Sequence, residues 1–312
     1  MELLAYRRRG LKHVITESLT RDDSRDVEAE LGVTSFGYLD AALAARPDAV
    51  FVCTPTSQHA AIAQRAADAG CHLFIEKPVS HTLEGIGRLL DTVAEKRLVA
   101  LVGSQWRFHP GVRALRDLLH AGTLGALRSA EIDYAEYLPD WHPYEDYRTS
   151  YAARAELGGG VVLTQIHDYD LAFWLFGPPR AVRATGGHLS DLDVDVEDTV
   201  DATLETASCA IRVRQSFAVR PARRTIVVRG ARATATLDLL AGRLTLEPPL
   251  APALALTDYQ RNQMFTDEAA HFLACIAGGT PPAIPLAQGA AVLGVALAVK
   301  EAMKTGRTVE IT

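Results

Sequence analysis

The sequence predicts an α/β protein of two domains, in which a parallel sheet with helical crossovers is followed by an α+β domain with an open, mostly antiparallel sheet. Three observations predict it. At 312 residues the chain is long for one hydrophobic core. Up to residue 102, short apolar segments alternate with helical ones, which is typical of parallel strands joined by helices. From residue 181 to about residue 245, strand-like segments follow one another with only turns between them, which favours antiparallel pairing.

The first domain is expected to span residues 1–102 and to open with a helix over residues 2–9, because Gly10 stands where a helix C-cap is favoured. Strands are expected at residues 13–16, 49–53, 73–75 and 98–102. Helices over residues 21–31, 40–45, 58–69 and 82–96 would connect them.

The second domain is expected to span residues 103–312, and its terminal helices can pack back on the first domain. Its expected helices are residues 109–121, 161–176, 267–277 and 286–304. Its expected strands are residues 127–138, 181–188, 198–206, 210–218, 224–228, 233–239 and 308–311, with a Pro- and Ala-rich connector at 249–256. One face of this sheet would pack on helices while the other stays free, which predicts a homodimer or homotetramer.

The composition is that of an ordinary globular protein, with 48% hydrophobic and 22% charged residues. The formal net charge of -6 argues against a general affinity for nucleic acid or anionic membrane. The first ten residues do not resemble a targeting signal, and no apolar run reaches the roughly 20 residues that span a bilayer. We therefore expect a cytoplasmic protein with neither a nucleic-acid nor a membrane partner.

No metal site is expected from the spacing of potential ligands. The only compact set, His142, Glu145 and Asp146, lies on a loop, which gives a metal enzyme little support. The four cysteines lack the spacing of a metal site or a disulfide framework, and we expect reduced thiols at Cys53, Cys71, Cys209 and Cys275.

The tripeptide Glu76-Lys77-Pro78 stands at the end of the apolar strand 73–75. Ligands of parallel sheets bind beyond the carboxyl ends of the strands. A lysine held there beside a glutamate can present its cation to a substrate hydroxyl or carbonyl and take part in acid/base chemistry. An exposed ion pair before a turn proline is the alternative, and the spacing leaves both interpretations open.

Five features in this order resemble the Gfo/Idh/MocA oxidoreductases over nearly the whole chain. They are Cys53-Thr-Pro-Thr-Ser-Gln-His59, Glu76-Lys-Pro78, Arg107-Phe-His-Pro110, Gly158-Gly-Gly160 followed by His167, and the terminal helix pair. The resemblance implies a Rossmann-type nicotinamide-binding domain, an open-faced α/β domain, and hydride transfer between NAD(P) and a sugar, inositol or related ring. The stretch 137–148 is most similar to members encoded with polysaccharide or nucleotide-sugar pathways.

The resemblance also implies roles for individual residues. Lys77 would hydrogen-bond the hydroxyl being oxidised, Glu76 would approach the nicotinamide ribose, and His167 would be the acid/base partner of Lys77 at the same reacting carbon. Removal of the hydroxyl proton as the hydride leaves lowers the barrier.

For the cofactor, the resemblance places Thr54, Pro55 and Ser57 along the dinucleotide and His59 near its nicotinamide end. Glu17, after the strand 13–16, could accept hydrogen bonds from the adenosine ribose, which favours NAD over NADP. A solvated loop carboxylate stays an equal alternative for Glu17.

The start of the chain departs from the family, whose members begin with an apolar strand and a Gly-x-Gly-x-x-Gly turn. Here Met1 falls inside the region that matches the following helix, so this first strand is expected to be missing. Either the start codon is placed too late, by roughly 20 residues, or the cofactor site is impaired. The joint retention of Lys77, Glu76 and His167 favours the first explanation. A non-catalytic assembly or regulatory subunit is the alternative function.

A second departure concerns the partner of His167. Relatives usually carry an Asp three or four residues before this His, where the present chain has Thr164. Asp170 lies three residues after His167 and could replace that carboxylate on the same helix side. His167 could instead be an ordinary core histidine, although the triple glycine before it, which permits close backbone approach, favours a functional role. Arg107 either faces the active site or pairs with a carboxylate.

The loop 139–148 is the predicted source of substrate specificity. Trp141 and Tyr144 offer flat faces for a sugar ring, and Arg148 offers a bidentate donor for a carboxylate or phosphate. Alternatively, Trp141, Tyr144 and Tyr147 pack the loop down onto the protein.

Overall fold

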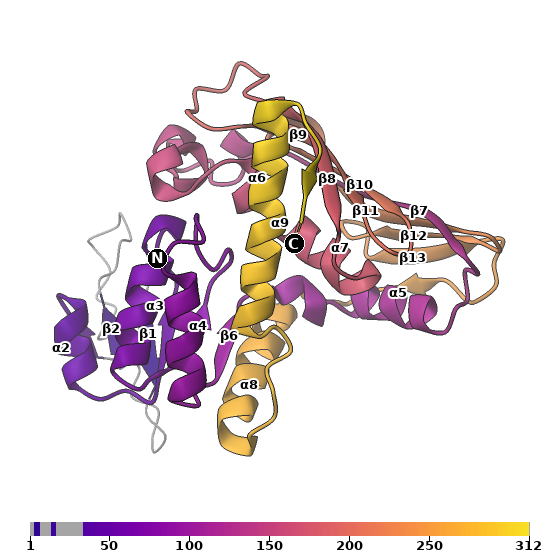
Figure 1. Cartoon of the computed structure of the whole chain (residues 1–312). Coiled ribbons are helices and arrows are strands. Elements are labelled where there is room, and N and C mark those ends of the chain that lie inside the picture. Colours follow the sequence, from indigo (N-terminus) through magenta and orange to yellow (C-terminus); the bar gives the residue numbers. More distant parts are fainter. Residues whose placement is uncertain (1–2, 7–13, 17–33, 312) are drawn as a thin grey trace. The chain divides into compact units, whose positions relative to one another are not determined.

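The computed structural model describes residues 3–6, 14–16 and 34–311, and it confirms the α/β class with two sheets (Figure 1). The chain forms two compact units. Unit 1 comprises residues 1–103 and 269–290, and unit 2 comprises residues 104–268 and 291–312.

Unit 1 is built on a six-stranded sheet with the strand order β3-β2-β1-β4-β5-β6. Neighbours β4, β5 and β6 run parallel, and Phe51, Phe74 and Leu101 lie side by side across them. Every residue of β4 is buried, as expected of a strand covered on both faces. The bounds are β1 Leu3–Tyr6, β2 Val14–Thr16, β3 Thr34–Phe36, β4 Ala49–Val52, β5 His72–Ile75 and β6 Ala100–Val102.

The predicted opening helix is wrong at Leu3–Tyr6, which form strand β1. This strand pairs antiparallel with β2 on one side and with β4 on the other. A strand between two others pairs both rows of its backbone groups, and such tertiary pairing overrides helix propensity. The rest of that prediction and the helix expected over residues 21–31 lie outside the described residues.

Helices α3 and α4 lie side by side in unit 1 (Figure 1). Phe272 of another helix, α8, closes the core, with its ring edge-on to the stacked rings of Phe51 and Phe74 at 5.3 and 5.7 Å. Helix α4 begins four residues later than predicted, because Gly85 before it is left-handed, with φ of 76°. The bounds are α2 Leu39–Ala44, α3 His59–Asp68, α4 Ile86–Glu95 and α8 Gln263–Gly278, of which residues 269–278 belong to unit 1.

Unit 2 contains a nine-stranded sheet with the order β14-β13-β12-β11-β7-β10-β9-β8-β15. All neighbours are antiparallel except β7 and β10. Strand β11 is longer than predicted, and β13 and β14 extend the sheet beyond the predicted strands. The bounds are β7 Leu127–Tyr137, β8 Ala181–Gly187, β9 Thr199–Glu205, β10 Ala210–Ser216, β11 Ala218–Gly230, β12 Thr234–Asp238, β13 Arg243–Glu247, β14 Leu254–Ala255 and β15 Val309–Glu310.

Helices α5 and α7 lie along one face of this sheet (Figure 1). The single helix predicted over residues 161–176 is wrong, because Gln165 and Ile166 separate α6 from α7. Gln215 on β10 of the sheet donates a hydrogen bond to the main-chain carbonyl of Gln165 at this break. The bounds are α5 Pro110–His120, α6 Val161–Thr164, α7 His167–Phe176 and α9 Leu286–Thr305.

The other face of the sheet carries cross-strand ion pairs. Alternating residues of β7, β9 and β10 are buried, so that the charged residues between them share the opposite face. Opposite charges on neighbouring strands attract one another without needing burial. The pairs are Arg183 with Glu205, Arg212 with Asp201, Arg214 and Arg223 with Asp133, and Arg229 with Glu131.

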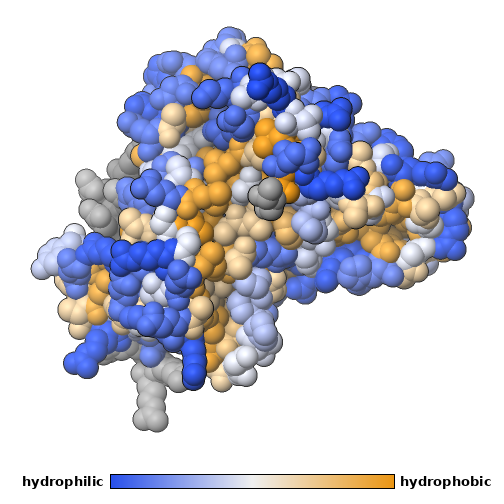
Figure 2. Space-filling view, viewed as in Figure 1, coloured by the Kyte–Doolittle hydropathy of each residue, from blue (hydrophilic) through white to orange (hydrophobic). Residues whose placement is uncertain are grey.

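Helix α9 is long and apolar enough, by length and composition alone, to cross a membrane. The expectation that no apolar run reaches this length is therefore wrong in its literal form. Half of the most apolar window of α9 is buried in the fold, as in the core helix of a globular protein. Figure 2 shows that the hydrophobic residues of this helix are partly exposed on one face of the molecule.

Candidate functional site

In unit 1, the predicted site residues follow the carboxyl ends of β4 and β5. Thr54 comes after β4, and Glu76 and Lys77 come after β5. His59, the first residue of α3, joins the two segments, because its Nδ1 lies 2.7 Å from the carbonyl oxygen of Pro78 and its Nε2 lies 2.8 Å from that of Thr54. Its side chain is 1% exposed, and burial lowers the pKa of His59. His59 therefore fixes the spacing of the two segments, and direct contact with a cofactor stays a prediction.

The hydroxyl of Thr54 is buried, and none of the residues that the structure describes hydrogen-bonds it. A buried hydroxyl without a partner costs about 1–3 kcal/mol, so that an external hydrogen-bonding group is favoured there. Pro55 and Ser57 lie in the turn between Thr54 and α3. These residues fit a dinucleotide running along this edge of the sheet. Glu17, predicted at the adenosine ribose, lies outside the described residues.

Glu76 is half-buried beside Lys77, and its Oε2 accepts a 3.2 Å hydrogen bond from the Lys77 backbone N–H. Burial raises the pKa of Glu76, while the Lys77 ammonium lowers it. Gly103 leaves room for this carboxyl, because a Cβ there would lie 3.3 Å from Oε1 of Glu76. Lys77 is also half-buried at this edge.

In unit 2, His167 is the first residue of α7 and is 4% exposed. Its Nε2 lies 3.4 Å from Nε2 of Gln105, a residue that the sequence reasoning missed. Thr164 is buried one turn earlier. Because Lys77 and His167 belong to different units, their approach to one reacting carbon stays a prediction.

Asp170 and Arg107 form a buried ion pair, with side chains 6% and 2% exposed. Arg107 donates from Nε to Oδ2 of Asp170 at 2.8 Å and from Nη2 to Oδ1. Ser104 also donates its hydroxyl to Oδ2, at 2.6 Å. Of the two alternatives for Arg107, the structure shows the pairing with a carboxylate. Asp170 anchors α7 to the segment after β6, and its direct role in proton transfer stays a prediction.

The triple glycine before α6 is required by packing. A Cβ on Gly159 would lie 2.3 Å from the carbonyl oxygen of Tyr151. A Cβ on Gly160, whose φ is +97°, would lie 2.3 Å from Oε1 of Glu197. Lys300 of α9 holds this carboxylate in place through bonds of 3.0 and 2.9 Å.

Replacing Gly160 with Ala is expected to lower the melting temperature of unit 2 by about 10 °C, because Glu197 must move and its bond to Lys300 is lost. Gly177→Ala is the matched control, since Gly177 has a similar φ of +88° with nothing within 4 Å of a Cβ. Calorimetry should give a clearly smaller shift for the control. Equal shifts would mean that φ strain accounts for the whole effect.

Two family models match the chain. Residues 2–104 match the model described as "Oxidoreductase family, NAD-binding Rossmann fold", and residues 112–236 match "GFO/IDH/MocA C-terminal domain". The chain belongs to the Gfo/Idh/MocA family. This confirms the resemblance that the sequence motifs indicated.

Two relatives of the chain are named as dehydrogenases. Inositol 2-dehydrogenase of Rhizobium meliloti is 34% identical over 53% of this chain and 48% of its own length. UDP-N-acetylglucosamine 3-dehydrogenase of Acidithiobacillus ferrooxidans is 38% identical over 52% of this chain and 46% of its own. The chain thus spans about half the length of these curated relatives. A solved structure of UDP-N-acetylglucosamine 3-dehydrogenase from A. ferrooxidans superposes with a TM-score of 0.73 at 29% identity, covering 89% of this chain and 85% of that one. These comparisons give no support to the non-catalytic alternative.

The loop 139–148 of this family member packs partly on its own unit. The ring of Trp141 stands edge-on to Phe217 at 5.3 Å. Arg148 donates from Nε and Nη2 to both carboxylate oxygens of Asp146, and the backbone N–H of Asp193 donates to the Tyr147 hydroxyl. Packing is thus observed for Trp141 and Tyr147. Tyr144 is 80% exposed, and contacts of Trp141, Tyr144 and Arg148 with a substrate stay predictions.

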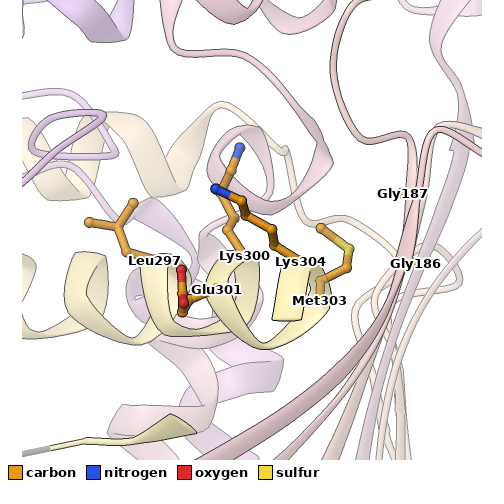
Figure 3. Close-up of a pocket in the computed structure, with 7 residues that line it drawn as sticks. All are labelled: Gly186, Gly187, Leu297, Lys300, Glu301, Met303 and Lys304. Atoms are coloured by element: carbon orange, nitrogen blue, oxygen red, sulfur yellow. The ribbon is translucent and has the colours of Figure 1, made fainter. Parts of the chain in front are cut away.

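A cavity of 560 Å³ in unit 2 lies between α9 and the end of β8 (Figure 3). The side chains of Lys300 and Lys304 extend to the same side of α9, and Glu301 points elsewhere (Figure 3). Glu197 already binds the Lys300 ammonium, which offsets its charge. None of the predicted site residues that the structure describes lines this cavity. Among the described residues, no group of three His, Cys, Asp or Glu is placed to hold a metal ion.

Proposed function

We propose that this chain is an NAD(P)-dependent oxidoreductase that transfers a hydride between nicotinamide and a hydroxyl or carbonyl carbon of a sugar, nucleotide sugar or polyol. The observation that carries the proposal is the edge of the sheet in unit 1, where His59 holds the Thr54 turn and the Glu76-Lys77 segment together. Support comes from the match of residues 2–104 to the NAD-binding Rossmann fold of the family.

In the proposed reaction, the cofactor handles the hydride, and the side chains handle the substrate hydroxyl and its proton. A bound nicotinamide supplies the hydride acceptor. Lys77 hydrogen-bonds the substrate hydroxyl, and His167 takes its proton as general base, so that the carbon loses a hydride and the oxygen loses a proton. In the reverse direction His167 returns the proton to the carbonyl oxygen. NAD is proposed ahead of NADP, on account of Glu17.

A thermal shift tests cofactor binding before any substrate is known. NAD or NADP at 100 times its dissociation constant should stabilise the protein by about 2.7 kcal/mol. Thr54→Val, which removes the buried hydroxyl at nearly constant shape, should reduce that shift. Thr92→Val is the control, because the Thr92 hydroxyl donates to the Arg88 carbonyl on an exposed helix. If neither nucleotide raises the melting temperature of the 312-residue chain, the proposed function is wrong.

We also propose that copies associate as a homodimer or homotetramer through the open face of the unit 2 sheet, and that the protein works in the cytoplasm. The ion pairs of this face, such as Arg212 with Asp201, can exchange partners between two copies. Light scattering should then give two or four chains per particle at low salt.

A further inference from the structure

Gln215 on β10 is a buried glutamine that meets three groups in the segment carrying His167. Its Nε2 donates to the carbonyl oxygen of Gln165 at 2.7 Å and to Oδ2 of Asp168 at 2.8 Å. Its Oε1 accepts from the Tyr169 hydroxyl at 2.9 Å. The residue is 1% exposed. Both N–H groups and the carbonyl of this amide are therefore used inside unit 2.

The groups that Gln215 holds surround the break between α6 and α7. Gln165 has φ and ψ of -102° and 35°, outside the values of a helix. Its carbonyl accepts a 3.2 Å bond from the Asp168 N–H, as in a tightened turn, and the shorter bond from Gln215. Ile166 is the second residue of the break, and His167 follows it as the first residue of α7. The place where α7 starts is thus tied to the sheet.

Arg224 on β11 holds the same break through the side chain of Gln165. Its Nη2 donates to Oε1 of Gln165 at 2.7 Å. The guanidinium lies over the rings of Trp106 and Tyr134, at 4.7 and 4.5 Å. These cation–π contacts stabilise the positive charge of the buried Arg224 side chain. Strands β10 and β11, which lie on either side of β7, therefore fix the main chain and the side chain of Gln165, respectively.

We propose that Gln215 is a positioning residue, which sets the start of α7 and thereby the direction of the His167 imidazole. The proposal rests on the proposed function, in which His167 is the acid/base group. Asp168, directly after His167, is the acidic member of the network, and Arg224 is the basic one. Burial raises the pKa of Asp168, while Arg224 and Gln215 lower it.

The test is Gln215→Glu, which keeps the shape of the side chain and replaces its donor with an oxygen. That oxygen faces the Gln165 carbonyl and the Asp168 carboxylate, both acceptors, so that burial and the like charge raise the pKa of the new carboxyl. A carboxyl whose pKa is raised in the folded state loses its stabilising effect as pH rises through that pKa. The melting temperature of the variant should be close to wild type at about pH 5 and about 10 °C lower at about pH 8.

Gln263→Glu is the matched control. The Gln263 amide also donates to an aspartate, Oδ1 of Asp267 at 2.7 Å, but on the exposed surface of α8. Solvent screens the two charges there, so its melting temperature should stay within about 1 °C of wild type at either pH. Adding Asp168→Asn to Gln215→Glu removes one of the two buried negative charges and should recover much of the loss at high pH. Absence of that recovery would contradict the proposed network.

The readout for positioning is the imidazole of His167, followed by NMR titration, together with steady-state kinetics. At about pH 8, Gln215→Glu should move the His167 resonance and lower kcat by about 10-fold or more, with the affinity for NADH unchanged. A lower melting temperature with an unmoved resonance would make Gln215 merely structural and overturn the proposal. If the wild type turns over no sugar, polyol or nucleotide sugar, the proposed function fails, and the NMR titration still decides whether Gln215 positions His167.

Discussion

Lys77→Met is expected to lower turnover by about 10²–10⁴-fold, while NADH binding and the melting temperature should stay close to those of the wild type. The ammonium stands at the end of β5, where a substrate hydroxyl is proposed to bind, and Met keeps its length without charge or donor. Initial rates are followed by NADH absorbance with myo-inositol, UDP-N-acetylglucosamine and a panel of simple sugars. Binding is followed by the fluorescence of NADH.

The control for Lys77→Met is Lys96→Met in the same unit. The Lys96 ammonium donates to the Asp68 carbonyl at 2.6 Å on the exposed surface. Lys96→Met therefore removes one exposed positive charge that is not part of the proposed site. Rates should change by less than about twofold, as for a surface substitution. Wild-type rates in Lys77→Met, with wild-type rates also in the control, would remove Lys77 from the mechanism.

Asp170→Asn is expected to lower the free energy of unfolding of unit 2 by about 3–5 kcal/mol, because the buried Arg107 guanidinium loses the carboxylate that it binds. The double replacement Arg107→Met with Asp170→Leu should cost less than either single change, since no charge stays buried. Denaturant titration measures Asp170→Asn, the double variant and its two single changes. An exposed pair gives the control: Asp68→Asn, beside Arg88, should cost under about 1 kcal/mol.

Kinetics of Asp170→Asn separate anchoring from a direct proton-transfer role. If Asp170 replaces the carboxylate that relatives carry near Thr164, kcat falls even under conditions in which the variant is fully folded, and the pH profile changes shape. If Asp170 only anchors α7, the pH profile keeps its shape. A fully stable Asp170→Asn protein would contradict the ion pair as an energetic anchor.

Most elements that position the site follow from local sequence patterns. The apolar runs ending at Val52 and Ile75 predict buried parallel strands, and the residues after them lie at one sheet edge, joined by His59. Strand β1 could not be predicted in this way. Residues 3–6 carry helix-forming side chains, and their strand depends on pairing with β2 and β4, which are distant in the sequence.

The residues that support the site could not be predicted from local sequence patterns either. Nothing local distinguishes Gln215 from other glutamines, although it occupies a position where the alternation of β10 predicts a buried side chain. A polar residue at such a position is the signal that could have found it. The break at Gln165 was missed because residues 161–176 contain no Gly or Pro that would mark a helix end, and its causes lie on β10 and β11.

The nine-stranded sheet ends on both sides in strands of two residues, β14 and β15. These short edge strands offer few unpaired backbone N–H and C=O groups to an incoming strand, which disfavours fibre growth by edge-to-edge pairing. In the homo-oligomer that we propose, copies would therefore stack sheet against sheet, a closed arrangement whose size is limited by symmetry.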